Sequence, residues 1–227
     1  MIQLRSLTLF VIFSVIALIS GQHRREDYCR LCRTHTMCLF PNPNPDPVCL
    51  VSHVGLNSDQ KREILELHNN LRQKVASGGE IRGNPGPQPP AISIPDLIWD
   101  DELAIIAQRW VNTCPFHQDE CRHVQRFLVG QNIGVLYVET VPSNIITRII
   151  NDWYKEVNKF DSRQVERVMD YSDVHRYTQL VWSTTRFIGC GYINHRFNNH
   201  VIITTLVCNY GPAGNNIGGK VYDIKRT

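Results

Sequence analysis

Five polar side chains stand where the apolar pattern of the chain favours a folded interior: His68, Gln131, Glu156, His175 and Arg176. Histidine and carboxylate side chains are the groups that proteins use for general acid–base catalysis and for binding divalent cations. Taken alone, a histidine on an apolar stripe is more often a hydrogen-bonded core residue than a ligand, and a glutamate at its edge is usually solvated. The five residues therefore indicate a candidate site without deciding its chemistry.

The sequence lacks the short motifs of common catalytic families. It contains no Gly-x-Ser-x-Gly turn, no His-Glu-x-x-His zinc pair and no phosphate-binding loop of the Walker type. The tripeptide Arg-Gly-Asn at 82–84 differs from the integrin-binding Arg-Gly-Asp in its last residue, and no Asn-x-Ser/Thr acceptor occurs. The net charge is +3 with dispersed basic residues, so no nucleic-acid surface is predicted.

Eight cysteines indicate how the chain is held together. An even number behind a secretory N-terminus favours a disulfide framework. The spacing Cys29-x-x-Cys32 also occurs in zinc knuckles, but no second such pair or matching histidines complete a four-ligand set. On the order of a hundred pairings are possible, so the residues alone leave the connectivity open. The cysteines are Cys29, Cys32, Cys38, Cys49, Cys114, Cys121, Cys190 and Cys208.

Residues 1–21 have the layout of a secretory signal peptide. Arg5 precedes an apolar run at 9–19, and two small residues follow that run. The run is too short to cross a bilayer of about 30 Å, and a strongly polar stretch comes next. We therefore expect a mature chain that begins near Gln22, is secreted, and has no membrane span.

Residues 22–57 and 58–227 differ in character. The first segment is rich in cysteine and proline, and the run PNPNPDP at 41–47 fixes backbone angles and removes hydrogen-bond donors. We expect this extension to be irregular and to be stapled by cystines onto a single domain at 58–227.

Three amphipathic helices are predicted within that domain, because apolar residues recur at helical spacing. Ser58 and Asp100 are placed to cap the first two helices. His68 shares the inward face of the first helix, and Glu156 lies at the edge of the buried face of the third. The three helices span 58–77, 100–114 and 143–157.

Extended segments are predicted at 126–138, 187–193 and 201–211. The last two are rich in β-branched and aromatic residues, and each carries one cysteine. If they pair antiparallel, Cys190 and Cys208 come close enough to bond. Three helices and a small sheet predict a compact α+β domain.

Two stretches resemble the signatures of the CAP superfamily, named for cysteine-rich secretory proteins, antigen five and pathogenesis-related one. They are YTQLVWSTTRFIGCG (177–191) and LVCNYGPAGN (206–215), and HNNLRQKVASG, WDDELAIIAQRWVNTC, GQNIG and WYKEV precede them in the family's order. The cysteine-rich leader, the run GNPGPQPPA and the pair Cys114/Cys121 resemble the venom allergen five (antigen five) branch of insects.

The resemblance implies a fold and a disulfide pattern. The fold is an α-β-α sandwich, in which helices flank a central antiparallel sheet and the N-terminal extension is attached by disulfides. The implied pairs are Cys29–Cys38, Cys32–Cys121, Cys49–Cys114 and Cys190–Cys208.

The resemblance also implies a cleft lined by two histidines and two acids, which holds a divalent cation in several members. Carried over by position, these residues are His68, Gln131, Glu156 and Arg176, so two of the four depart from the pattern. Arg176 has no lone pair to give and stays charged. His175, one residue earlier, would turn by about 100° on a helix and point away. We therefore expect no metal, no cofactor and a guanidinium–carboxylate pair in the cation's place.

The function implied is that of a secreted, venom allergen five-like protein of venom, saliva or haemolymph, monomeric and without enzymatic activity. Its partner would be an unknown extracellular ligand. Two alternatives stay open: a carrier of lipid or sterol, and a hydrolase in which His68 and Glu156 supply the chemistry.

Overall fold

The computed structural model describes residues 27–170, 172–198 and 200–226. The predicted signal peptide at 1–21 lies outside the described residues. The helices are α2 (Thr36–Leu39), α3 (Ser58–Ala76), α4 (Asp101–Val111), α5 (Ile145–Tyr154) and α6 (His175–Val181), with 3-10 turns η1 (Lys155–Asn158) and η2 (Ser162–Gln164). The strands are β1 (Val51–Val54), β2 (Ile98–Trp99), β3 (Gly130–Val138), β4 (Phe187–Arg196) and β5 (Ile202–Gly211).

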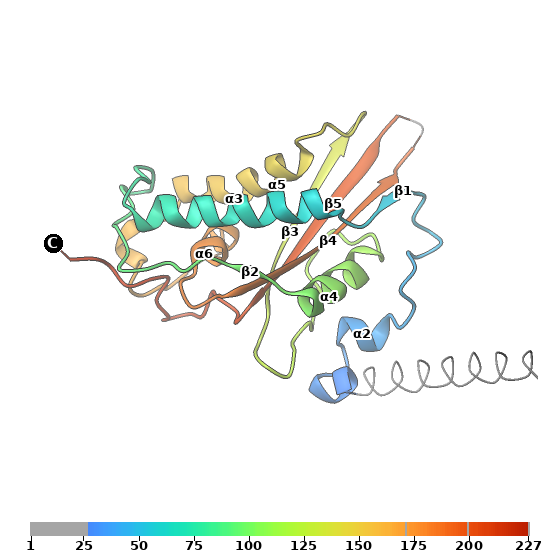
Figure 1. Ribbon diagram of the computed structural model, residues 1–227, viewed down its shortest axis with the longest axis horizontal. Helices are drawn as coiled ribbons and strands as arrows, with labels where there is room; N and C mark the ends of the chain where they lie inside the picture. Colours follow the sequence, from blue (N-terminus) through green and yellow to red (C-terminus); the bar gives the residue numbers. More distant parts are fainter. Residues whose placement is uncertain (1–26, 171, 199, 227) are drawn as a thin grey trace, which may run out of the picture.

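The strands form one sheet in the order β1-β4-β5-β3, in which all neighbours are antiparallel, and the short β2 adds in parallel to β4. Figure 1 shows α3, α5 and α6 on one side of this sheet and α4 with α2 on the other. The predicted α-β-α sandwich is therefore confirmed.

The two faces of the sheet are set by alternation along β4 and β5. Cys190, Tyr192 and Tyr210 point into the main core with the residues of α3, α5 and α6. Their neighbours Gly189 and Gly191 face α4, where a Cβ atom would collide with the helix backbone. Glycine at these two positions thus lets α4 pack directly on the sheet.

The starts of α3 and α4 are set by side-chain caps. Asp100 accepts a hydrogen bond from the backbone N–H of Leu103 and caps α4 as predicted. The prediction for α3 was wrong by one residue, because Asn57 rather than Ser58 is the cap. Asn57 and Gln60 exchange side-chain and backbone hydrogen bonds in a capping box. Ser58 is therefore the first residue of α3 and not its cap.

Some elements do not correspond to the prediction. The described part of the domain at 58–227 has a further helix, α6, beyond the three that were predicted. It is too short to show clear periodicity, and the burial of Tyr177 and Leu180 holds it in place. The extension at 22–57 is not irregular throughout, because it contains α2 and β1, and β1 pairs with β4. Part of the extension is therefore part of the sheet.

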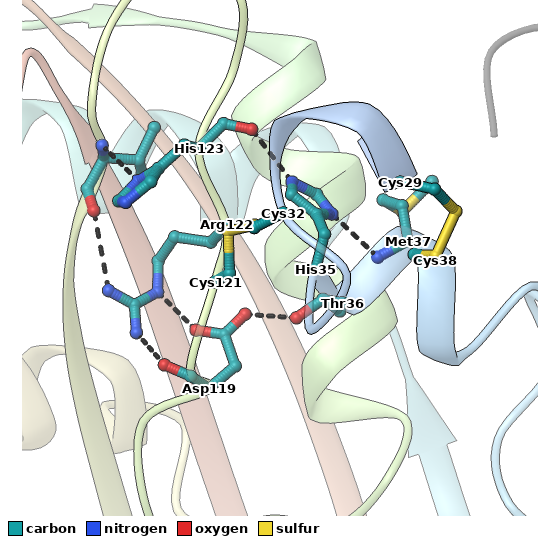
Figure 2. Close-up of a disulfide and its surroundings, with 11 residues drawn as sticks. Cys29, Cys32, His35, Thr36, Met37, Cys38, Asp119, Cys121, Arg122 and His123 are labelled. Atoms are coloured by element: carbon teal, nitrogen blue, oxygen red, sulfur yellow. Dashed lines mark hydrogen bonds and ion pairs between the residues drawn. A yellow bond between two sulfur atoms is a disulfide. The ribbon is translucent and has the colours of Figure 1, made fainter. Parts of the chain in front are cut away.

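All four disulfides that the resemblance implies are present in the structure. Cys190 and Cys208 are directly opposite each other on β4 and β5. Figure 2 shows Cys32–Cys121, which joins the extension to the segment before β3. Within the part of the chain that the structure describes, no helix combines the length and apolarity needed to cross a bilayer.

Candidate functional site

Glu156 and Arg176 form the centre of the candidate site. Glu156 lies on η1, directly after α5, and its side chain is nearly buried. Its carboxylate accepts hydrogen bonds from Arg176 Nε at 2.5 Å and from the backbone N–H groups of Arg176 and Tyr177 at 2.8 and 3.0 Å. The negative charge of the carboxylate therefore neutralises the guanidinium of Arg176 and also stabilises the positive N-terminal end of α6.

The short helix α6, which carries Arg176, is held at both ends. At its start, Glu156 binds the first N–H groups, as described above. At its end, the fully buried Arg72 donates to the carbonyls of Leu180 and Trp182 at 2.8 and 3.0 Å. Burial lowers the pKa of Arg72 to about 9, so the side chain stays charged at neutral pH. Arg72 was not singled out from the sequence.

His175 does not replace the ligand position that Arg176 occupies. Its Nδ1 atom lies 3.1 Å from the carbonyl of Ser172, within its own local turn. Arg176, by contrast, reaches Glu156 and keeps 40% of its side chain exposed. The geometry agrees with the turn of one residue along a helix that the sequence suggested.

His68 is completely buried on α3, between the helix backbone and the sheet. Its Nδ1 lies 2.7 Å from the carbonyl of Ile64 and its Nε2 lies 3.0 Å from the hydroxyl of Tyr210. Because a carbonyl only accepts, Nδ1 carries the proton and Nε2 accepts from Tyr210. Desolvation lowers the pKa of His68 to about 4. The imidazole is neutral and both of its nitrogens are used.

Gln131 does not join the other three residues, which corrects the expectation of a single cleft lined by four side chains. Its amide donates to Asn209 Oδ1 at 2.9 Å and accepts from the backbone N–H of Asp119 at 3.3 Å. Asn209 in turn donates to the carbonyl of Leu103 on α4. Gln131 therefore faces α4, on the side of the sheet opposite His68.

Asn132, the next residue of β3, lies on the face of the sheet that contacts His68 and α6, where Gln131 was expected. Its Nδ2 donates to the backbone carbonyl of Arg176 at 3.0 Å and lies 3.4 Å from the hydroxyl of Tyr210. The hydrogen bonds thus run from His68 through Tyr210 and Asn132 to the backbone of Arg176. Sequence reasoning missed Asn132, although the period of two along a strand could have indicated it.

Comparison with known families agrees with this architecture. The model of the family described as CAP, the cysteine-rich secretory protein family, matches residues 65–210. The chain belongs to the CAP family. The matched range covers most of α3, all of α4, α5 and α6, the strands β3 and β4, and most of β5.

Among curated relatives, this CAP chain is similar to insect venom allergens. It is 46% identical to venom allergen 3 of Solenopsis invicta, over 88% of this chain and 90% of that protein. It is 42% identical to venom allergen 5 of Dolichovespula arenaria, over 88% of this chain and all of that protein. The chain is therefore a venom allergen-like member of the family.

Solved structures share the fold. The crystal structure titled NaASP2 with Zn2+ has a TM-score of 0.65 and 27% identity, and covers 81% of this chain and 91% of that one. The structure of BmVAL-1 has a TM-score of 0.64 and 24% identity, and covers 75% and 85%. The second likeness concerns the fold alone.

The CAP site of this chain offers few groups to a metal or substrate. Within the described residues, no three histidine, cysteine, aspartate or glutamate side chains gather as metal ligands. All eight cysteines are in disulfides. Of the four family positions, Glu156 is paired with Arg176, His68 is enclosed and Gln131 faces α4. The arrangement stabilises the packing of α6 against η1, α3 and β3.

Proposed function

We propose that this protein is a secreted, non-enzymatic binding protein of the venom allergen type. The observation that carries the proposal is the Glu156–Arg176 ion pair. It uses the one acid of the family positions, while His68 is buried and neutral with both nitrogens bound. A hydrolase needs a general base within reach of substrate, and neither residue is free for that role.

Turnover assays test the non-enzymatic role. The purified protein is incubated with a mixed peptide library and with simple esters, and a Glu156→Gln variant serves as the matched control. We expect no hydrolysis above that of the control. Hydrolysis by the native chain that Glu156→Gln or His68→Ala abolishes would contradict the proposal and favour the hydrolase alternative.

Secretion is supported by the layout of residues 1–21 and by the four disulfides, which persist in oxidising compartments. Expression of the whole chain in insect cells, followed by N-terminal sequencing of the medium fraction, tests this. We expect a mature protein that begins near Gln22. Retention of the intact chain inside the cells would contradict it.

The carrier alternative requires an apolar chamber. The groove between α3 and α5 is lined mostly by charged and amide side chains, and the hollow on the other side of α3, which has polar and apolar lining residues in equal part, is open to solvent rather than enclosed. We therefore expect solvent extraction of the purified protein to release no stoichiometric lipid. Lipid at one molecule per chain by mass spectrometry would favour the carrier instead.

A further inference from the structure

The groove between α3 and α5 carries a cluster of positive charge away from the Glu156–Arg176 pair. It has a volume of about 570 Å³ and opens to solvent. Four cationic side chains line it, which are Lys74, Arg82, Arg148 and Lys155. Figure 1 shows these two helices side by side on the face of the sheet opposite α4.

Two of the cations, Arg82 and Lys74, are held in place by the buried carboxylate of Glu80. Glu80 is fully buried and accepts from Arg82 at 2.6 and 2.7 Å and from Lys74 at 3.1 Å. The hydroxyl of Tyr154 donates to Glu80 as well, at 2.8 Å. Burial by itself would raise the pKa of Glu80, but these hydrogen bonds lower it to about 2. Arg82 and Lys74 are therefore fixed before any ligand arrives.

The aromatic ring of Tyr154 supports the same two cations. The Arg82 guanidinium carbon lies 5.2 Å and Lys74 Nζ lies 5.9 Å from the ring centroid. Both side chains keep part of their surface open to solvent, 34% and 45%. Each can therefore give further hydrogen bonds outward.

The other two cations lie on one face of the neighbouring helix segment, seven residues apart. Lys155 pairs with Asp152 at 2.6 Å on the surface. Arg148 is exposed, and within the described residues no acidic side chain pairs with it. The four cations face two carboxylates, Asp152 and the buried Glu80, so the groove keeps a net positive charge.

We propose that this groove binds the sulfate groups of an acidic polysaccharide. The cations line a concave groove between two helices, which admits a narrow anionic chain along its length. Lys74 also borders a second hollow on the other side of α3, where Asn70, Gln73 and Ser77 lie on the helix side and mostly apolar residues of 91–95 lie opposite. These amide and hydroxyl groups suit the hydroxyls of a sugar chain that continues past Lys74. This proposal names a ligand class for the proposed extracellular binding role. It rests on that role only in requiring that the protein is secreted and so meets extracellular polysaccharides.

Titration calorimetry with a short heparin oligosaccharide at physiological salt tests the groove. The test variant is Arg148→Glu, which reverses the unpaired charge and leaves the anchors of Glu80 untouched. The matched control is Arg33→Glu, an exposed arginine three residues before α2, a helix that packs with α4 on the far side of the sheet. We expect Arg148→Glu to weaken binding at least about tenfold, and Arg33→Glu to change it less than about twofold.

Further arms separate the sources of the anion. Arg176→Ala should bind the oligosaccharide like the native chain, which distinguishes this groove from the family site. Inorganic phosphate and vesicles of anionic phospholipid should bind far more weakly than the oligosaccharide. Absence of oligosaccharide binding, equal loss in both charge-reversal variants, or preference for vesicles or phosphate would each overturn the proposal.

Discussion

Two regions of the molecule contain the same pair of components, an arginine–carboxylate ion pair and a buried histidine. In one, Glu156 pairs with Arg176 on the inner face of the sheet, near His68. In the other, Asp119 pairs with Arg122 next to His35, where the N-terminal extension meets the domain (Figure 2). Both regions have the residue types of a reactive site, and in both the groups compensate one another.

The regions differ in burial. Asp119 also accepts from the hydroxyl of Thr36, and only 2% of its side chain and 11% of that of Arg122 are exposed. Arg176 keeps 40% of its side chain in solvent, and the Glu156 carboxylate has two further donors in the backbone of α6. Asp119 fastens the extension to the domain through Thr36, whereas the Glu156–Arg176 pair closes a site. Loss of one partner should therefore cost more at Asp119 than at Arg176.

Asp119→Ala should produce the largest effect. It leaves Arg122 charged, buried and unpaired, and removes the acceptor of Thr36. We expect the free energy of unfolding to fall by about 3–5 kcal/mol, measured by urea denaturation with the disulfides intact. Asp101→Ala, at an exposed carboxylate on α4, is the control. A loss under about 1 kcal/mol at Asp119 would show that the buried pair does not fasten the extension.

Acid should destabilise the protein through the buried histidines. The pKa of His68 is about 4 in the folded chain and about 6.5 when unfolded, so the unfolded state binds a proton first as pH falls. Stability should therefore decrease from about pH 6.5 down to pH 4, by about 3 kcal/mol for this residue. Burial also lowers the pKa of His35, which acts in the same direction.

Denaturant unfolding between pH 4 and pH 7 measures this loss. A His68→Asn variant, compared with the native chain, should show a flatter profile, and His175→Asn should leave the profile unchanged. An unaltered slope in His68→Asn would contradict the assignment of a neutral, enclosed imidazole.

Arg176→Ala should have the smallest effect on stability, about 1 kcal/mol, because Glu156 keeps its two backbone donors and gains water. Thermal unfolding against the native chain measures it. Arg163→Ala, which breaks an exposed pair with Asp161, should give no measurable change. A loss at Arg176 as large as that of Asp119→Ala would remove the distinction between the two regions.

Local signals in the sequence predicted much of the fold. The apolar stripe of α3 placed His68 inside, and the structure buries it completely. Two β-rich runs that could pair antiparallel across a short polar turn placed Cys190 next to Cys208, and the two are cross-strand partners. In both cases the decisive information lies within one helix or one hairpin.

What the sequence left out depends on contacts between distant segments. The network of His35, Thr36 and Asp119 joins residues more than eighty positions apart, and no local period indicates it. The side of the sheet that Gln131 faces depends on the register of β3, and a shift of one residue exchanges it with Asn132. The resemblance to the family indicated which residue holds the position, Gln131, whereas the register of the strand decides the side of the sheet to which its side chain points.

Titration of the native chain with zinc tests most directly the claim that Arg176 occupies the place of a cation. His68 is enclosed and Gln131 faces α4, so neither can join Glu156 as a metal ligand, and we predict no tight binding by calorimetry at neutral pH. His68→Ala and Glu156→Gln serve as comparison variants. A saturable signal of sub-micromolar affinity that either substitution abolishes would contradict the account.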